Sequence, residues 1–203
     1  MSIEIKLSKK RITYKKAMLF LNKRVEAVKN GDNRELIWIL EHPKTYTAGV
    51  SFKQNEIIDK KIKIVKTNRG GKITLHNPGQ KIIYFVINLN NRKKDIRKLI
   101  NYIELSIIEY LKTLKIEAKN DKKNIGIWVK EKKIAAIGLR VSRWVAFHGF
   151  SLNISNNLKE YLKIIPCGLD NTKITSVFHE KKIIPKNFEN KIITILIKNI
   201  NKI

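Results

Sequence analysis

The chain has 203 residues, enough for one domain with a sizeable core, and its hydrophobic fraction of 43% with 8% aromatic residues excludes a disordered protein. Its formal net charge of +26 favours nucleic acid, acidic lipid or an acidic protein as partner, although lysine, asparagine and isoleucine are also abundant together in AT-rich coding sequences. No apolar stretch approaches the roughly 20 residues of a membrane span, and the first 20 residues lack a secretory signal, so we expect a cytoplasmic protein without membrane insertion.

The N-terminal part of the sequence predicts a strand, a helix and a second strand. Apolar and polar residues alternate over residues 3–7, which is typical of an edge strand. Apolar residues recur at helical spacing over residues 14–28, and Asn30-Gly31-Asp32 ends this predicted helix. The continuous apolar run 36–40 predicts a short buried strand, followed by a turn at Glu41-His42-Pro43.

The middle of the sequence predicts a glycine-hinged β segment and then a long helix. Strands are expected over residues 62–67, 72–75 and 82–89, separated by glycine-containing turns at residues 68–71 and 76–79. Apolar residues then recur every three or four positions over residues 96–114, the strongest periodicity in the sequence. This pattern predicts a second amphipathic helix.

The C-terminal part predicts further β structure, a turn and a last helix. Residues 125–129 and 133–141 flank the polar residues 130–132 and predict a hairpin, whose second arm leads to a strand over residues 145–153. Apolar residues at helical spacing over residues 188–200 predict the last helix. The expected fold class is α+β, with a mixed sheet and helices packed on it, in a single domain over residues 1–203 with a possible small lobe from about residue 155.

The single cysteine, Cys167, excludes an intramolecular disulfide and a metal site built from several cysteines. A lone cysteine is most often a small buried hydrophobic residue. Cys167, however, stands between Pro166 and Gly168 in a predicted turn, where proline and glycine fix the backbone on both sides of the sulfur. Because a thiol is mostly protonated at neutral pH, a reactive Cys167 needs a neighbouring base or cation.

Lys133 is the candidate for that neighbour, although most of the 43 lysine and arginine residues are expected to be solvated surface groups. It opens the apolar strand that continues through residues 134–138, so its ammonium group can border a site lined by small residues. A lysine partly removed from water can exchange a proton with a thiol or an amine. Composition alone does not distinguish Lys133 from the other lysines.

The glycine-rich run 69–74 is not a Walker phosphate-binding loop. Lys66 stands where that motif has its first glycine, and Ile73 stands where it has Ser or Thr. The glycines are turn residues or positions at which the backbone approaches a ligand closely. The four histidines lie far apart without the spacing of metal ligands, so we expect neither a metal nor a cofactor.

Four segments of the sequence, taken together and in this order, resemble the lipoyl(octanoyl) transferase family. They are Glu-His-Pro at 41–43 with Tyr-Thr-Ala-Gly at 46–49, Arg-Gly-Gly-Lys-Ile-Thr-Leu-His-Asn-Pro-Gly-Gln at 69–80, Lys-Ile-Ala-Ala-Ile-Gly-Leu-Arg-Val-Ser-Arg-Trp at 133–144 with His-Gly at 148–149, and Pro-Cys-Gly-Leu at 166–169. Each segment alone is a weak signal, but their shared order over residues 36–177 covers most of the chain.

The resemblance implies a biotinyl and lipoyl protein ligase-like fold, related to class II aminoacyl-tRNA synthetase cores. It also implies a two-step octanoyl transfer without ATP. In that family, the cysteine that matches Cys167 takes an octanoyl group from acyl carrier protein as a thioester. A lysine of a lipoyl-accepting domain then attacks the thioester to form an amide, and the lysine that matches Lys133 manages the protons. The accepting domains belong to 2-oxoacid dehydrogenase complexes and to the glycine cleavage H protein.

The family's substrate-binding segments map onto three parts of this sequence, which would wall an acyl channel. They correspond to Arg69, Gly70, Gly71, Lys72, Ile73, Thr74, Leu75 and His76, to Ala136, Ile137 and Gly138, and to Gly149, Phe150 and Ser151. The sequence departs from the family at two places, with Asn77 in place of glycine and Leu75 in place of an aromatic residue. Asparagine tolerates a left-handed backbone, so the turn is expected to survive, whereas Leu75 leaves the fine shape of the acyl pocket open.

Three other functions remain possible from the sequence. An ATP-dependent lipoate or biotin ligase shares the implied fold, but such an enzyme needs neither Cys167 nor Lys133 in these roles. A nucleic-acid-binding module would use the basic surface, but the sequence shows no RNP motif, zinc-finger spacing or helix-turn-helix, so specific nucleic-acid binding is not expected. An inactive family member would not be expected to retain both residues.

Overall fold

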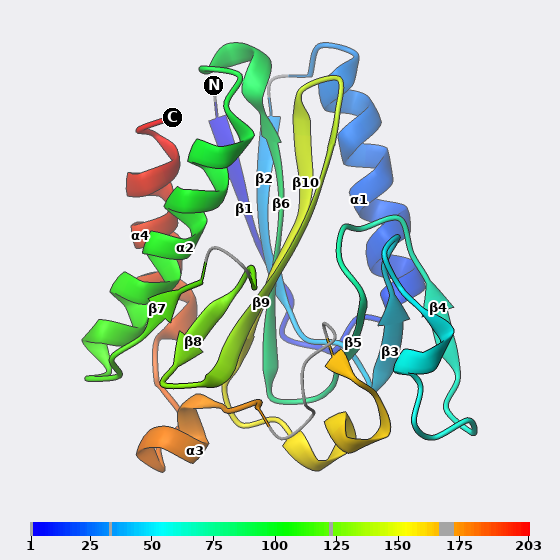
Figure 1. The fold of residues 1–203 in the computed structure, drawn as a ribbon. Helices are drawn as coiled ribbons and strands as arrows, with labels where there is room; N and C mark the ends of the chain where they lie inside the picture. Colours follow the sequence, from blue (N-terminus) through cyan, green and yellow to red (C-terminus); the bar gives the residue numbers. More distant parts are fainter. Residues whose placement is uncertain (1, 33, 122–123, 167–172) are drawn as a thin grey trace.

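The computed structural model describes residues 2–32, 34–121, 124–166 and 173–203. Within them the chain forms a seven-stranded sheet, a three-stranded sheet and helices on both faces of the larger sheet (Figure 1). The mixed α+β class predicted from the sequence is therefore confirmed.

The large sheet contains strands from both halves of the chain. Their order across the sheet is β1 (Ser2–Leu7), β2 (Arg34–Leu40), β6 (Gln80–Asn88), β10 (Val145–Asn153), β9 (Lys132–Ser142), β8 (Ile127–Val129) and β7 (Lys119–Asn120). β1 pairs with β2 in parallel and the other neighbours pair antiparallel, so the sheet is mixed. β1 lies at the edge of the sheet, as its alternating pattern predicts.

The helices lie where their apolar faces meet the large sheet. α1 (Tyr14–Lys29) covers one face, and α2 (Ile96–Thr113) and α4 (Phe188–Ile200) cover the other (Figure 1). The side chain of Asp95 caps α2 by accepting a hydrogen bond from the backbone N–H of Lys98 at 2.9 Å. Each helix buries residues three and four positions apart, which is why the periodicity of the sequence located all of them.

The segment after residue 155 begins with a 3₁₀ turn (Leu158–Lys163) and a short helix, α3 (Val177–Lys181), neither of which the sequence predicted. α4 then packs against α2, and its buried side chains belong to the same core cluster as those of α2 and the large sheet. This shared core supports the single-domain organisation expected from the sequence, which stays a prediction.

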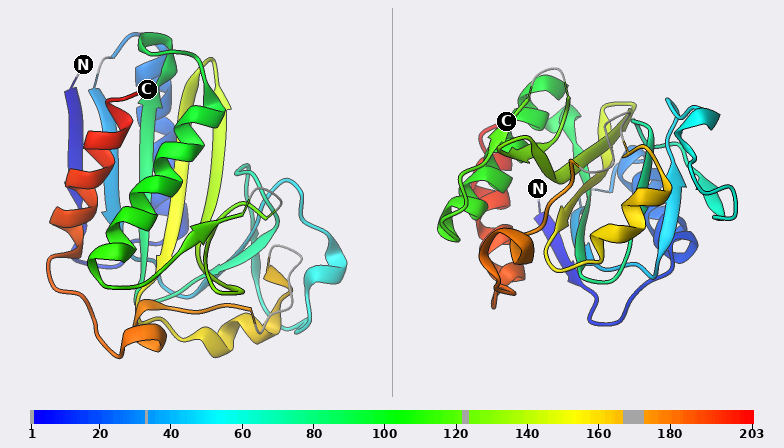
Figure 2. Two further views of the ribbon diagram at one scale, coloured as in Figure 1. Left: turned by 60° about the vertical axis from the view of Figure 1, so that its left-hand side comes forward. Right: turned by 60° about the horizontal axis from the view of Figure 1, so that its bottom comes forward.

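The small sheet lies beside the large one (Figure 2) and has the strand order β4 (Ile64–Lys66), β3 (Thr45–Ala48) and β5 (Ile73–His76). Short 3₁₀ turns lie between β3 and β4 at Gln54–Glu56 and after β6 at Leu89–Asn91. The sequence predicted β4 and β5 but not β3, because four residues that follow a proline turn carry little periodicity of their own. Within the described part of the chain, no helix is both long and apolar enough to cross a membrane.

Candidate active site

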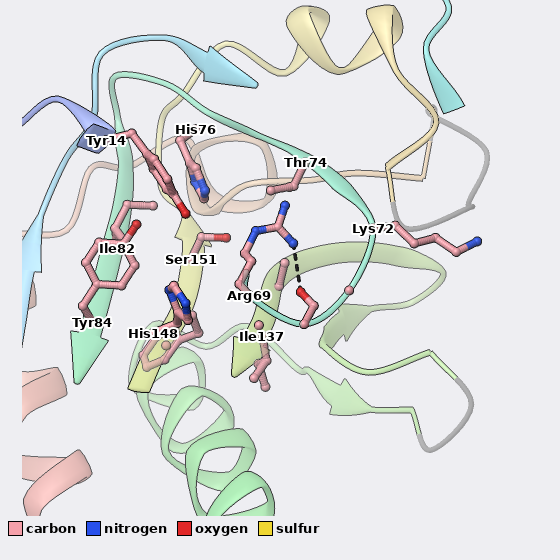
Figure 3. A pocket seen from close by; sticks show the side chains of 16 residues that line it. Tyr14, Arg69, Lys72, Thr74, His76, Ile82, Tyr84, Ile137, His148 and Ser151 are labelled. Carbon is pink, nitrogen blue, oxygen red and sulfur yellow. Dashed lines mark hydrogen bonds between the residues drawn. The ribbon is translucent and has the colours of Figure 1, made fainter. Parts of the chain in front are cut away.

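A pocket opens between the two sheets (Figure 3). It is a narrow slot with a cavity volume of about 60 Å³. Its lining residues come from α1, the loop between β4 and β5, strand β5 of the small sheet, and the central strands β6, β9 and β10. They are Tyr14, Arg69, Gly70, Gly71, Lys72, Thr74, His76, Ile82, Tyr84, Ala136, Ile137, Gly138, His148, Gly149, Phe150 and Ser151.

All but two of the expected substrate-binding residues line this one slot, although they come from three separate segments. The exceptions are Ile73 and Leu75, which are fully buried in a separate cluster of apolar side chains beneath the small sheet. Because side chains alternate along a strand, β5 turns Thr74 and His76 toward the slot and Ile73 and Leu75 away from it. Leu75, whose effect on the shape of the pocket the sequence left open, does not line the slot.

Asn77, the other departure from the family, does not adopt the left-handed backbone that the sequence suggested. The left-handed residue of this turn is Gly79, with φ +85°. The side chain of Asn77 instead holds the turn to the chain after β10: its Nδ2 donates to the carbonyl of Asn157 at 2.9 Å, and its Oδ1 accepts from Nδ2 of Asn156 at 3.1 Å.

The loop of residues 68–71 forms one wall of the slot and is tied to both sheets. On the small sheet, Nη2 of Arg69 donates to the carbonyl and the hydroxyl of Thr47 at 2.8 and 2.9 Å. On the large sheet, the backbone N–H of Gly70 donates to the carbonyl of Leu139 at 3.2 Å. A Cβ atom added at Gly49 would lie 2.2 Å from the carbonyl oxygen of Gly71, so the close approach of these backbones requires glycine.

Buried histidine and tyrosine side chains form the inner part of the slot. Nδ1 of His42 faces the carbonyl of Ile12, so this nitrogen carries the hydrogen, and Nε2 then accepts from the hydroxyl of Tyr84 at 3.0 Å. His76 stacks on Tyr14 with 6.1 Å between ring centroids and lies 5.6 Å from the ring of His42. These contacts gather aromatic groups from α1, β5 and β6.

Burial keeps these imidazoles neutral. It lowers the pKa of His76 to about 3, with a further contribution from the neighbouring His42. It also lowers the pKa of His148 to about 4, assisted by the nearby positive charges of Arg69 and Arg140, and it lowers the pKa of His42. The inner slot therefore carries no histidine charge at neutral pH.

Four residues line the slot that were not expected from the sequence: Tyr14, Ile82, Tyr84 and His148. Tyr84 and His148 stand inside the most apolar strands of the sequence, where a polar side chain needs a buried partner or a site. A polar residue within an apolar strand can be recognised in the sequence, but the sequence does not show toward which face of the sheet its side chain points.

Lys133 is buried, with 4% of its surface exposed, at the start of β9. Its Nζ donates to the carbonyl of Ile125 at 3.0 Å and lies 4.9 Å from the ring centroid of Trp128. Lys133 is not one of the lining residues of the slot, but it precedes Ala136, which is, by three residues on the same strand. The lysine that the sequence distinguished is therefore held inside the fold rather than in solvent.

Cys167 lies outside the residues that the structure describes, so its expected approach to Lys133 stays a prediction. The chain on either side of it is described. Before it, the backbone N–H of Ile165 donates to the carbonyl of Glu56 at 2.8 Å. After it, the carbonyl of Lys173 accepts from the backbone N–H of Lys133 at 2.8 Å, and Thr175 donates back to the carbonyl of Lys133 at 3.0 Å. In the described ranges no three His, Cys, Asp or Glu side chains are grouped as metal ligands would be.

Known structures share this architecture. A crystal structure of lipoate-protein ligase A bound with ATP superposes with a TM-score of 0.77 at 13% identity, covering 100% of this chain and 85% of that one. Biotin protein ligase from Aquifex aeolicus gives a TM-score of 0.57 at 14% identity, covering 100% of this chain and 70% of that one. At these identities the likeness establishes the biotinyl and lipoyl ligase-like fold.

Sequence relatives are closer. An octanoyltransferase of Wolbachia sp. subsp. Brugia malayi (strain TRS) is 41% identical over 180 residues, which cover 86% of this chain and 88% of that protein. One from Anaplasma marginale (strain Florida) is 40% identical over 181 residues, covering 86% and 85%. Residues 13–196 match the family model of the lipoyl protein ligase A/B catalytic domain. With the slot, the fold and these relatives in agreement, the chain belongs to the lipoyl protein ligase A/B catalytic-domain family and, within it, to the octanoyltransferase family.

Proposed function

We propose that this chain transfers an octanoyl group from octanoyl-acyl carrier protein to a specific lysine of lipoyl-accepting domains, through a thioester on Cys167. The observation that carries the proposal is the convergence of three separate family segments on one narrow slot between the sheets. Apolar side chains and glycine backbone line much of that slot, as an alkyl chain requires. The identity of about 40% with octanoyltransferases over most of the chain gives independent support.

In the first step, the sulfur of Cys167 attacks the carbonyl carbon of the donor thioester. The bond to the carrier sulfur breaks, and the proton of the Cys167 thiol passes by way of Lys133 to the departing carrier thiolate, which leaves as a thiol. In the second step, the amine of the accepting lysine attacks the new thioester. An amide forms, and a proton of the amine returns to the sulfur of Cys167. Exchange between thioesters is nearly neutral in energy and conversion to an amide is downhill, so no ATP is consumed.

Lys133 suits the role of proton carrier because its ammonium group is held rather than free. The carbonyl of Ile125 and the ring of Trp128 fix its position, and burial removes competing bulk water. The chain that follows Cys167 is paired with the backbone of Lys133 through Lys173 and Thr175, which supports the approach of the two residues.

The partners in this proposal are octanoyl-acyl carrier protein as donor and, as acceptors, the lipoyl domains of 2-oxoacid dehydrogenase complexes and the glycine cleavage H protein, all in the cytoplasm. The net charge of +26 is suited to acidic protein partners, because opposite charges accelerate encounter and orient the complex.

The test is intact-mass analysis of the chain after incubation with octanoyl-acyl carrier protein, compared with the variant Cys167→Ser. We expect one octanoyl adduct on the unmodified chain and none on the variant. An adduct of equal amount on both proteins would contradict the assignment of Cys167.

The second candidate is an ATP-dependent ligase, favoured by the structural likeness to lipoate-protein ligase A. Modification of a lipoyl domain in the presence of octanoate, ATP and magnesium, without acyl carrier protein, would support the ligase. We expect no modification under those conditions.

A further inference from the structure

The slot has an open end and a closed end. Gly71 is exposed, and Gly70, Lys72 and the lining residues of β9 are partly exposed. Tyr14, Tyr84 and His148, in contrast, have at most 5% of their surface exposed. Figure 3 shows Lys72 on one side of the slot and Tyr84 with His148 on the opposite side. An acyl chain that enters past Lys72 therefore ends beside these buried rings.

The strand register gives the same direction. The lining of the slot on β9 begins at Ala136, three residues beyond Lys133, and Ala136 pairs with Ser151. Leu139, three residues further along β9, pairs with His148, so this part of the slot spans about 10 Å, comparable with the reach of an extended octanoyl chain. If the acyl carbonyl reacts at the end of the slot nearer to Lys133, as the proposed function requires, the methyl end of the chain points toward His148.

His148 is fixed in an uncommon backbone conformation at this closed end. Its φ is +69°, in the left-handed region, in the middle of strand β10. Nε2 lies 2.9 Å from Oδ1 of Asn68, so this nitrogen donates the hydrogen bond, and the ring stacks on Phe147 with 5.0 Å between centroids. Such a conformation persists only where the surrounding structure fixes it. The ring is therefore a rigid part of the slot.

The other ring nitrogen supports the view that the ring faces a ligand. Nδ1 of His148 is buried and has no hydrogen-bond partner among the described residues. A buried acceptor without a partner costs free energy, and in native proteins such atoms are concentrated where a ligand or water completes the site. The rest of the ring is held by Asn68 and Phe147, so Nδ1 is left without a partner at the end of the slot, where the hydroxyl of Tyr14 also has none among the described residues.

We propose that the imidazole of His148 is the end stop of the acyl slot and sets the length of acyl chain that the enzyme accepts. This inference rests on the proposed function. A chain longer than octanoyl meets a ring that neither its backbone nor its two contacts allow to move, whereas an octanoyl chain ends against it. His148 is thus a specificity-determining residue, separate from the reacting groups.

The test compares acyl carrier protein loaded with octanoyl, decanoyl and dodecanoyl groups as donors for the full chain and for two variants. His148→Gly removes the ring, and glycine adopts a positive φ without strain. His148→Asn keeps a shorter side chain that also tolerates this backbone. We expect the ratio of kcat/KM for decanoyl over octanoyl donors to rise on the order of tenfold in His148→Gly and by an intermediate factor in His148→Asn.

His179→Gly is the matched control, because it removes an imidazole that is 56% exposed and does not line the slot. Its ratio of kcat/KM for decanoyl over octanoyl donors should equal that of the starting protein. An unchanged ratio in both His148 variants would overturn the end stop, as would an equal shift in His179→Gly. Failure of the starting protein to transfer any acyl group would instead contradict the proposed function. If His148→Gly does not fold, the ratio of kcat/KM for decanoyl over octanoyl donors in His148→Asn tests the end stop by itself.

Discussion

At the scale of single residues, the position of the Lys133 ammonium group depends on a glycine that precedes it in the chain. Gly126 has φ +140°, a value that side-chain-bearing residues rarely adopt. A Cβ atom there would lie 3.0 Å from Cε and 3.3 Å from Nζ of Lys133, and 2.7 Å from the carbonyl of Ala135. Gly126 therefore leaves room for the lysine as well as providing the turn.

The variant Gly126→Ala should slow octanoyl transfer at least tenfold, because the added methyl group displaces Nζ from the carbonyl of Ile125. The matched control is Gly31→Ala, at φ +101° with nothing within 4 Å of the added Cβ atom. Both variants should lose about 1–3 kcal/mol of unfolding free energy from backbone strain, measured by urea denaturation. Equal transfer rates in the two variants would show that Lys133 does not need this position.

At the scale of elements, the loop 68–71 joins the two sheets and carries one wall of the slot. Its anchor on the small sheet is the pair of hydrogen bonds from Arg69 to Thr47, and its anchor on the large sheet is the bond from Gly70 to Leu139. Since the slot lies between the sheets, these bonds set its width.

Thr47→Val keeps the shape of the side chain but removes the hydroxyl that accepts from Arg69. We expect a several-fold rise in KM for the acyl donor and a loss of about 1–3 kcal/mol of stability, because a bond from a charged donor is lost in the interior. Thr45→Val, on the same strand, removes a bond to the carbonyl of Pro43 that does not involve the loop. An equal rise of KM in both variants would show that Thr47 does not affect donor binding through the loop 68–71.

At the scale of the whole molecule, the buried histidines link stability to pH. The pKa of His76 is lowered to about 3 and that of His148 to about 4, mainly by burial, while in the unfolded chain each returns to about 6.5. Below about pH 6.5 the unfolded chain thus binds protons that the folded chain does not. The contribution to stability is complete above that pH and is lost as the pH falls toward about 4 for His148 and about 3 for His76.

We expect the unfolding free energy to fall by about 1.4 kcal/mol per pH unit for each of these two histidines between about pH 6 and pH 5, measured by urea denaturation. His76→Gln should make the unfolding free energy fall less steeply with decreasing pH. His179→Gln should leave this slope unchanged, because that side chain is 56% exposed. A slope that is the same in His76→Gln as in the starting protein would show that His76 does not contribute.

The sequence by itself determined the elements with strong periodicity, the mixed α+β class and the segments that carry the site. Hydrophobic periodicity is a local property, so helices α1, α2 and α4 and the long strands β6, β9 and β10 could be located from it. Most of the residues that line the slot were identified in a different way, because the residues and the order of four segments resemble a known family. Cys167 and the approach of its sulfur to Lys133 stay predictions.

Only the tertiary structure decided which residues face the slot. The pairing of β5 with β3 separates Thr74 and His76 from Ile73 and Leu75, and no local pattern specifies which face of a buried strand meets a ligand. Tyr14, Tyr84 and His148 come together from elements far apart in the chain. Their convergence depends on how the two sheets and α1 pack, and that packing free energy comes from contacts between distant residues that the sequence does not show in advance.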